Sequence, residues 1–298
     1  MSLRILQFGA TGQLARELVR QAPGHDLAPT VLSRAEADLA DPRACAAAVE
    51  AHRPDLVVNA AAYTAVDKAE TEADLAHSVN AQAPAAMAQA CDRVGAAMVQ
   101  ISTDYVFSGD KGAPYLEGDA TGPLNVYGAS KLAGEAAVLS ACPRASVIRT
   151  SWVVSAHGQN FVKTMRRLAG GDAPVRVVDD QFGRPTAAAD LAGFILAAAP
   201  RWAAAQAGDP AFGLLHFANA GETTWRGLAQ TVFDLSLGAG VRAAEPIPTS
   251  AFPRPAARPM RGTLDTARLT EVFGVAPRPW PEALADIIAE LSAEEVHA

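Results

Sequence analysis

The chain has 298 residues, of which 50% are hydrophobic and 19% are charged, and its formal net charge is −7. This composition indicates a globular protein with a sizeable core, and the negative charge argues against a surface for nucleic acid or anionic membranes. No apolar run reaches the roughly 18 residues that a membrane span requires.

The first half of the sequence alternates strand and helix patterns. Strands separated by helical segments imply βαβ crossovers, so we expect an α/β fold with a doubly wound, Rossmann-like parallel sheet. The predicted strands are 3–8, 28–32, 55–59, 97–102 and 146–150, and the predicted helices are 13–21, 42–52, 79–94 and one that contains 127–131.

The second half is less regular. We expect residues 1–150 to form a dinucleotide-binding domain and residues 151–298 mainly a smaller substrate-binding lobe, with segments near 175–218 returning to the first domain. Ligands of such sheets bind at the carboxyl ends of the strands. The patterns predict strands at 175–178 and 214–218, helices at 161–168, 188–199 and 225–235, an extended loop at 246–259 and two short closing helices.

Three cysteines, Cys45, Cys91 and Cys142, are odd in number and widely spaced, which indicates neither a disulfide framework nor a zinc site. We expect each to pack as a small hydrophobic side chain. The N-terminus enters a strand without a secretory signal pattern, so we expect a protein of the reducing cytoplasm.

A glycine-rich turn follows the first predicted strand and opens a helix. Gly9 permits a tight turn, Gly12 lets the backbone approach a pyrophosphate, and Ala15 permits close packing of helix on sheet. The pyrophosphate would lie at the helix N-terminus, and a turn without a ligand is the alternative. The predicted cofactor contacts here are Gly9, Thr11, Gly12, Gln13 and Leu14.

The acidic residue that usually follows the second strand of such a site is missing, and Ser33 and Arg34 stand there instead. These residues suit a 2′-phosphate and favour NADPH, while NADH stays open, and a solvated surface charge is the alternative for Arg34. Further cofactor contacts are predicted for Asp38 and Leu39 at the adenine and for Ala60, Ala61 and Ala62 after the third strand.

Tyr127 and Lys131 stand four residues apart, on one face of a predicted helix. A neighbouring ammonium favours the phenolate of a tyrosine and should make Tyr127 a proton donor that works near neutral pH. Such a pair arises by chance in some sequences, so its weight comes from the dinucleotide turn on the same chain. Together the two features predict hydride transfer to a carbonyl.

In these features the sequence resembles the extended short-chain dehydrogenase/reductases and, among them, the dTDP-4-dehydrorhamnose reductase family, over essentially its whole length. The segments that carry the resemblance are 9–14, 59–70, 102–107, 123–135, 149–152, 180–186, 248–252 and 258–259.

The resemblance implies that Thr103, Tyr127 and Lys131 are catalytic. Hydride from NADPH would reduce the C4 ketone of a dTDP-linked 6-deoxy-4-hexulose, as the last step of dTDP-rhamnose synthesis. Tyr127 would protonate the alkoxide and Thr103 would orient the same oxygen. Lys131 would hold the nicotinamide ribose and keep Tyr127 acidic.

The resemblance also implies substrate contacts. Asp104 follows the catalytic threonine, and Tyr105 and Trp152 would line the sugar pocket, with core aromatics as the alternative reading. Asn160, with Gln159 beside it, would reach the nucleotide. Arg258 would neutralise the diphosphate, with a surface arginine as the alternative.

Other positions bear on the architecture of the site. Gly183 and Pro185 should fix a tight turn, and a cis peptide bond there stays open. Val154 and the segment 260–263 depart from the family pattern, so we assign no polar contact to 260–263 and expect Val154 to alter the sugar pocket.

Some family members associate through acidic residues around a metal. For Glu17 and Asp190 we expect surface carboxylates and no metal, which leaves a role for magnesium and a homodimer open.

Competing functions remain at this point. Nucleotide-sugar dehydratases of the superfamily follow the strand threonine with Asp-Glu, whereas here Tyr105 takes the place of the second carboxyl, so reduction is favoured over elimination. Another dTDP- or UDP-4-keto-deoxysugar reductase or epimerase is one alternative. A non-enzymatic NADP-binding regulatory subunit is another, although Thr103, Tyr127 and Lys131 are intact.

Overall fold

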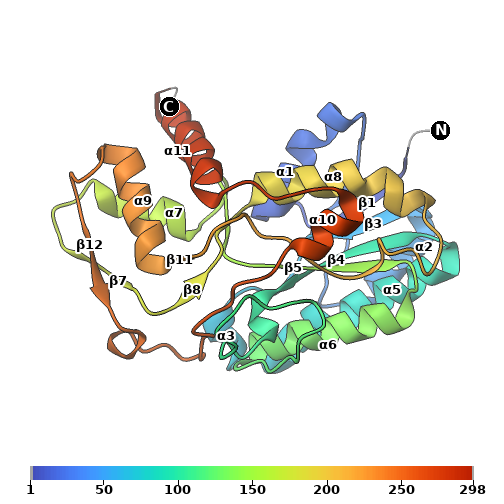
Figure 1. Ribbon diagram of the computed structural model, residues 1–298. Coiled ribbons are helices and arrows are strands. Elements are labelled where there is room, and N and C mark those ends of the chain that lie inside the picture. Colours follow the sequence, from blue (N-terminus) through green and yellow to red (C-terminus); the bar gives the residue numbers. More distant parts are fainter. Residues whose placement is uncertain (1–2, 297–298) are drawn as a thin grey trace.

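A six-stranded parallel sheet forms the centre of the protein in the computed structural model, which describes residues 3–296 (Figure 1). The strand order is β10-β5-β4-β3-β1-β2, so the chain reverses its direction of winding between β1 and β3, where open α/β sheets bind ligands. This confirms the predicted doubly wound fold. The strands are β1 (Ile5–Phe8), β2 (Thr30–Leu32), β3 (Leu56–Asn59), β4 (Ala97–Thr103), β5 (Ala145–Thr150) and β10 (Gly213–His216).

Helices cover both faces of this sheet. α1 (Gln13–Gln21) and α8 (Ala188–Ala204) pack on one face, and α2 (Pro42–His52), α5 (Ala83–Val94) and α6 (Val126–Ala141) on the other. Consecutive strand residues point to opposite faces, so Val57 and Val58 enter the two different cores. Burial on both faces explains why these strands are continuous apolar runs.

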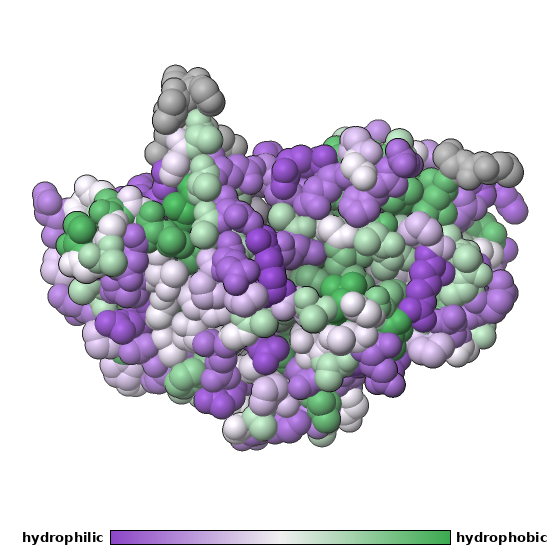
Figure 2. All heavy atoms as spheres, turned by 45° about the horizontal axis from the view of Figure 1, so that its top comes forward, coloured by the Kyte–Doolittle hydropathy of each residue, from purple (hydrophilic) through white to green (hydrophobic). Residues whose placement is uncertain are grey.

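A smaller lobe lies beside the sheet (Figure 1). It contains α7 (Phe161–Ala169), α9 (Trp225–Leu237), α11 (Trp280–Val296) and the parallel pair β7 (Val175–Val178) and β12 (Ala244–Ile247), around a core of its own. In Figure 2, α11 stands out from the lobe. Two small ladders join the lobe to the sheet: β6 (Val153–Val154) with β9 (Thr186–Ala187), and β8 (Phe182–Gly183) with β11 (Thr223–Thr224).

The segment 175–218 divides between the two parts. β7 pairs with β12 in the lobe, whereas α8 packs on α1 and β10 forms the edge of the main sheet. The domain boundary at residue 150 stays a prediction. No helix in the described part of the chain is long and apolar enough to cross a membrane.

Several predicted elements are wrong in detail. The helix predicted from residue 79 starts as a π-helical turn, Ser78–Gln82, after two short helices that the sequence reading missed, α3 (Val66–Ala69) and α4 (Ala73–His77). Of the two closing helices, α10 (Ala267–Phe273) is short, but α11 has 17 residues. The loop 246–259 begins inside β12 and contains a 3₁₀ turn, Thr249–Ala251.

The backbone around Gly183 also differs from the expectation. Gly183 lies in β8, and no cis peptide bond occurs in the described chain, so an unusual isomer near Pro185 is wrong.

Candidate active site

The glycine turn connects β1 to α1 at the point where the winding reverses. Gly9 has φ +98°, and a Cβ there would lie 3.2 Å from Ala61, so only glycine fits. Gly12 begins α1 without a side-chain cap and without an acidic residue in the first turn. The helix therefore presents uncapped N–H groups and its positive end, which suits a pyrophosphate.

The residues beyond β2 form the other half of the predicted cofactor site. The Arg34 guanidinium is 82% exposed and lies 3.1 Å from Asp38, while the backbone N–H of Ser33 donates to Glu36. A hydrogen bond from the Ala40 N–H holds the pKa of Asp38 below its usual range. Leu39 packs in the core, and the adenine contacts of Asp38 and Leu39 stay predictions.

Ala60 and Ala61 stand directly across from the glycine turn, and the exposed Ala62 follows them. The N–H of Ala60 donates to Phe8 at the end of β1, and the N–H of Ala61 donates to Asn59. Small side chains here leave the backbone accessible beside Gly9, as the predicted cofactor contact requires.

Tyr127 and Lys131 lie in the first two turns of α6. The Asn125 side chain caps this helix through Gly128 N–H (2.8 Å) and donates to the Ala257 carbonyl (2.7 Å). A Cβ at Gly128 would lie 2.2 Å from the Tyr105 carbonyl oxygen, so α6 packs tightly against the chain that follows β4. Asparagine is a favoured N-cap residue, so the start of this helix has a local sequence signal.

Thr103 ends β4 beside these residues and is 6% exposed. Its hydroxyl donates to Asp104 (3.1 Å) and accepts from the Tyr105 N–H (3.2 Å), and it lies close enough to the Tyr127 phenol to lower the pKa of that phenol. The Tyr105 and Tyr127 rings meet edge to face, 5.7 Å between centroids. The structure thus brings the predicted catalytic residues together at the carboxyl edge of the sheet.

The electrostatics of the site differ from the expectation. Burial raises the pKa of Tyr127 to about 12, opposed by the hydrogen bond with Thr103, so the predicted acidification by Lys131 is wrong for this arrangement. The Lys131 ammonium instead donates to the Ile101 carbonyl (2.5 Å). Burial lowers the pKa of Lys131 to about 8, and Glu135 opposes this shift. Burial also raises the pKa of Asp104 to about 7.

A buried ion pair lies behind the catalytic helix. Arg149 of β5 and Glu135 of α6 are 2.6 Å apart and only 2% and 3% exposed, and the Ser102 hydroxyl donates to the same carboxylate. Sequence reasoning placed Glu135 and Arg149 in matching segments but assigned neither a role. Glu135 and Arg149 lie 14 positions apart on different elements, so no local sequence pattern predicts that they pair.

The predicted sugar-pocket residue Trp152 follows β5 with φ +46°, a left-handed backbone that is rare for a bulky side chain. Thr150, two residues before Trp152, is the last residue of β5 and pairs with Thr103 at the end of β4. Trp152 therefore lies close to the strand end that carries Thr103. Val154 is buried in the core of the lobe, against which Trp152 packs, so its effect on the sugar pocket stays a prediction.

Arg258 is not a surface arginine. Its guanidinium is 18% exposed, pairs with Asp67 at 2.9 Å and contributes to the electrostatic surroundings of Tyr105. Asp67 also lies 3.8 Å from Arg254, so two arginines face one carboxylate. Two guanidinium groups on one carboxylate leave positive charge for a diphosphate.

Asn160 and Gln13 have structural partners. The Asn160 side chain caps α7 through Lys163 N–H and donates to Gln13 Oε1 (3.0 Å), while Gln13 donates to the Val153 carbonyl (3.1 Å). These bonds join the glycine-turn helix to the lobe. The nucleotide contacts of Asn160 and of the exposed Gln159 stay predictions.

The departing segment 260–263 approaches the site after all. A Cβ at Gly262 would lie 2.3 Å from a carboxylate oxygen of Asp104, so this glycine leaves room for Asp104. The Thr263 hydroxyl donates to Glu222 rather than into the site.

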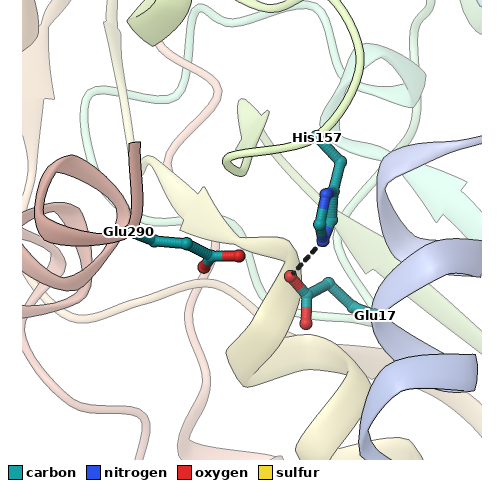
Figure 3. A group of neighbouring side chains, drawn as sticks. All are labelled: Glu17, His157 and Glu290. Carbon is teal, nitrogen blue, oxygen red and sulfur yellow. Dashed lines mark ion pairs between the residues drawn. The ribbon is translucent and has the colours of Figure 1, made fainter. Parts of the chain in front are cut away.

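Glu17 is 1% exposed, so the expected surface position is wrong for it. It forms a group with His157 and Glu290, whose ligand atoms lie within 4.8 Å of one another (Figure 3). Glu17 Oε1 lies 3.2 Å from His157 Nε2, and its other oxygen accepts from Arg20 and Gln21. Two carboxylates and an imidazole fit a divalent cation. Asp190 lies apart, paired with Arg278 at 2.9 Å.

Comparison with known proteins agrees over nearly the whole chain. The family model described as "RmlD substrate binding domain" matches residues 3–293. A dTDP-4-dehydrorhamnose reductase of Streptomyces griseus is 46% identical, over 95% of this chain and 92% of that protein.

Two solved structures named dTDP-4-dehydrorhamnose reductase have a TM-score of 0.89 and cover 97% of this chain and 100% of theirs. The one from Clostridium acetobutylicum is 36% identical, and the one from Bacillus anthracis, in complex with NADP, is 34% identical. The chain belongs to the dTDP-4-dehydrorhamnose reductase family.

Proposed function

We propose that this family member reduces the C4 ketone of dTDP-4-dehydro-β-L-rhamnose to dTDP-β-L-rhamnose with NADPH, the last step of dTDP-rhamnose synthesis. The observation that carries the proposal is the meeting of Thr103, Tyr127 and Lys131 at the sheet edge that also carries the glycine turn. The relatives named for this reaction, one of them solved with NADP, support it.

The residues of the turn fit a dinucleotide: Gly9 keeps a Cβ out of the crevice, and Gly12 leaves the start of α1 uncapped. Bound NADPH supplies a hydride. Tyr127 then donates its phenolic proton to the alkoxide oxygen, and Thr103, whose hydroxyl lies beside that phenol, orients the same oxygen. Because the phenol is buried with a raised pKa, it stays protonated until the alkoxide, a stronger base, develops.

Lys131 has the charge and position to hold the ribose hydroxyls of the cofactor, one helical turn from Tyr127. Trp152 and Tyr105 provide apolar faces for the deoxysugar, and Arg258 provides charge for the diphosphate. The Thr103 hydroxyl donates to Asp104 in the structure, so it turns from this carboxylate to donate to the substrate oxygen. No step of this reaction involves the Glu17 group.

The substrate class is tested by following NADPH oxidation with dTDP-4-dehydro-β-L-rhamnose, the matching UDP-sugar and the free sugar. An enzyme for nucleotide-linked sugars draws transition-state stabilisation from the remote nucleotide, so the free sugar should show lower kcat as well as weaker binding. Comparable kcat/KM on the free sugar would rule out the nucleotide-sugar assignment. A preference for the UDP-sugar would keep the chemistry and change the pathway.

The alternatives have structural counterparts. Elimination requires a second carboxyl after Asp104, but that position holds Tyr105, packed against Tyr127. A purely regulatory NADP-binding protein needs no catalytic alignment, whereas Thr103 lies beside Tyr127 here and Lys131 lies one helical turn further along α6. Turnover in the assay above decides between an enzyme and a regulatory subunit.

Arg34 provides a test of cofactor choice. Its exposed pair with Asp38 is worth little, so a 2′-phosphate can compete for the guanidinium. Arg34→Ala should weaken NADPH binding about ten- to a hundredfold and leave NADH binding nearly unchanged, measured by fluorescence titration. Arg16→Ala, which removes an exposed cation from α1, is the control. Equal losses for both cofactors would mean that Arg34 only supports the loop.

The cellular location and the oligomeric state are further parts of the proposal. The three cysteines are free and buried, which is compatible with the reducing cytoplasm. A homodimer is proposed from the family resemblance, and sedimentation with and without a divalent cation would test whether the Glu17 group takes part.

A further inference from the structure

Trp152 needs support that its own backbone does not provide. Its φ of +46° is unfavourable for a bulky residue and persists only where the surroundings impose it. Two backbone contacts contribute: the Thr186 N–H donates to the Trp152 carbonyl (3.2 Å), and the Ser151 hydroxyl donates to the Arg184 carbonyl (2.7 Å). These bonds fix the main chain but leave the indole ring free to rotate.

The ring is held by a second indole. Trp225, the first residue of α9 in the lobe, stacks on Trp152 with centroids 3.7 Å apart and planes at 12°. Phe161 packs against Trp225 at 4.8 Å and supports it in turn. Gly183 also borders the Trp152 ring, because a Cβ there would lie 2.5 Å from it. Trp152 is therefore confined by Trp225 and by Gly183.

Trp225 itself is fixed by the start of its helix. Thr224 caps α9 by accepting the Gly227 N–H (3.0 Å), and its hydroxyl donates to Asp179. Thr223 and Thr224 form β11, which pairs with β8 so that Thr223 lies opposite Gly183. One small ladder thus sets the positions of both Trp225 and Gly183.

We propose that Trp225 is a positioning residue for the reduction: it holds the Trp152 indole at the orientation in which the sugar ketone meets Tyr127. This rests on the proposed function, in which Trp152 borders the sugar. Trp225 acts through Trp152 and is not itself assigned a contact with the substrate. Because α9 belongs to the lobe, the stack also makes catalytic geometry depend on how the lobe is placed.

The test compares Trp225→Ala with Trp225→Phe by circular dichroism and kinetics. Two stacked indoles give an exciton couplet, which both variants should lose. Trp225→Ala should lower kcat by about a hundredfold, as expected for a misplaced reacting group, while the Kd for NADPH stays unchanged. Trp225→Phe keeps an aromatic face and should recover kcat to within about threefold of wild type. Trp280→Phe removes a lobe tryptophan outside the stack and should keep both couplet and kcat.

Gly183→Ala displaces the Trp152 indole and keeps Trp225 in the sequence. It therefore tests the proposal if Trp225→Ala fails to fold. Its methyl group should change the couplet and lower kcat. The proposal would be overturned if Trp225→Ala or Gly183→Ala lost or changed the couplet but kept the wild-type kcat. Equal kcat losses in Trp225→Phe and Trp225→Ala would overturn it too. If wild type does not reduce the dTDP-sugar, the proposed function fails, and a persistent couplet in Trp225→Ala would separately refute the stack.

Discussion

Replacing Tyr127 by Phe should lower kcat by a factor of about 10²–10⁴, the usual contribution of general acid catalysis. The ring and its edge-to-face contact with Tyr105 remain, so only the phenolic hydroxyl and its interaction with Thr103 are lost. Lys131 and the glycine turn are untouched, so the Kd for NADPH should change little. Steady-state NADPH oxidation and a binding titration measure the two quantities.

Tyr115→Phe is the matched control for this variant. Tyr115 is 3% exposed, and its hydroxyl accepts the Gly109 N–H at 2.9 Å, so it also loses a hydroxyl that has hydrogen bonds. We expect lower thermal stability but unchanged kcat per folded molecule. A Tyr127→Phe enzyme with more than roughly a third of wild-type kcat would remove Tyr127 from the mechanism.

The parts of the fold that sequence reading predicts well depend on local information. The helix Gln13–Gln21 and the helix Pro42–His52 have the predicted bounds, because a glycine turn or a proline at the first position marks each start. The trio Thr103, Tyr127 and Lys131 follows from the family resemblance, and the structure brings it together at one sheet edge.

What sequence reading missed depends on partners distant in the chain. Trp225 looks like an ordinary helix residue until its ring is seen on Trp152, 73 positions earlier. Glu17 looks like a solvated helix charge but is buried against His157. The expected direction of the Tyr127 pKa shift is also wrong. The four-residue spacing shows that Lys131 is near Tyr127, but it does not show that the Lys131 ammonium donates to the Ile101 carbonyl.

The largest stability effect should follow from Glu135→Gln. The Arg149–Glu135 pair is nearly inaccessible to water, and three nitrogen–oxygen hydrogen bonds join the two side chains. Removing the carboxylate charge leaves a buried guanidinium uncompensated, which costs about 3–5 kcal/mol in such pairs. Since domains have about 5–15 kcal/mol of stability, the variant should still fold at 25 °C, and urea unfolding would measure the loss.

Glu50→Gln is the control, because Arg93 and Glu50 lie at the same distance of 2.6 Å but are 53% and 47% exposed. Loss of that exposed pair should lower the free energy of unfolding by at most about 1 kcal/mol. Similar losses for the two variants would contradict the role of burial.

Glu135→Gln should also shift the pH dependence of kcat/KM. The Lys131 ammonium must be protonated to act, and burial lowers its pKa to about 8, so wild-type kcat/KM should fall as the pH rises through that value. Glu135 raises the pKa of Lys131, so removing its charge lowers that pKa further and shifts the basic limb toward lower pH. Glu50→Gln should leave the limb in place. A limb that stays near pH 8 in Glu135→Gln would mean that Lys131 does not set it, and that stability and catalysis are not linked through this carboxylate.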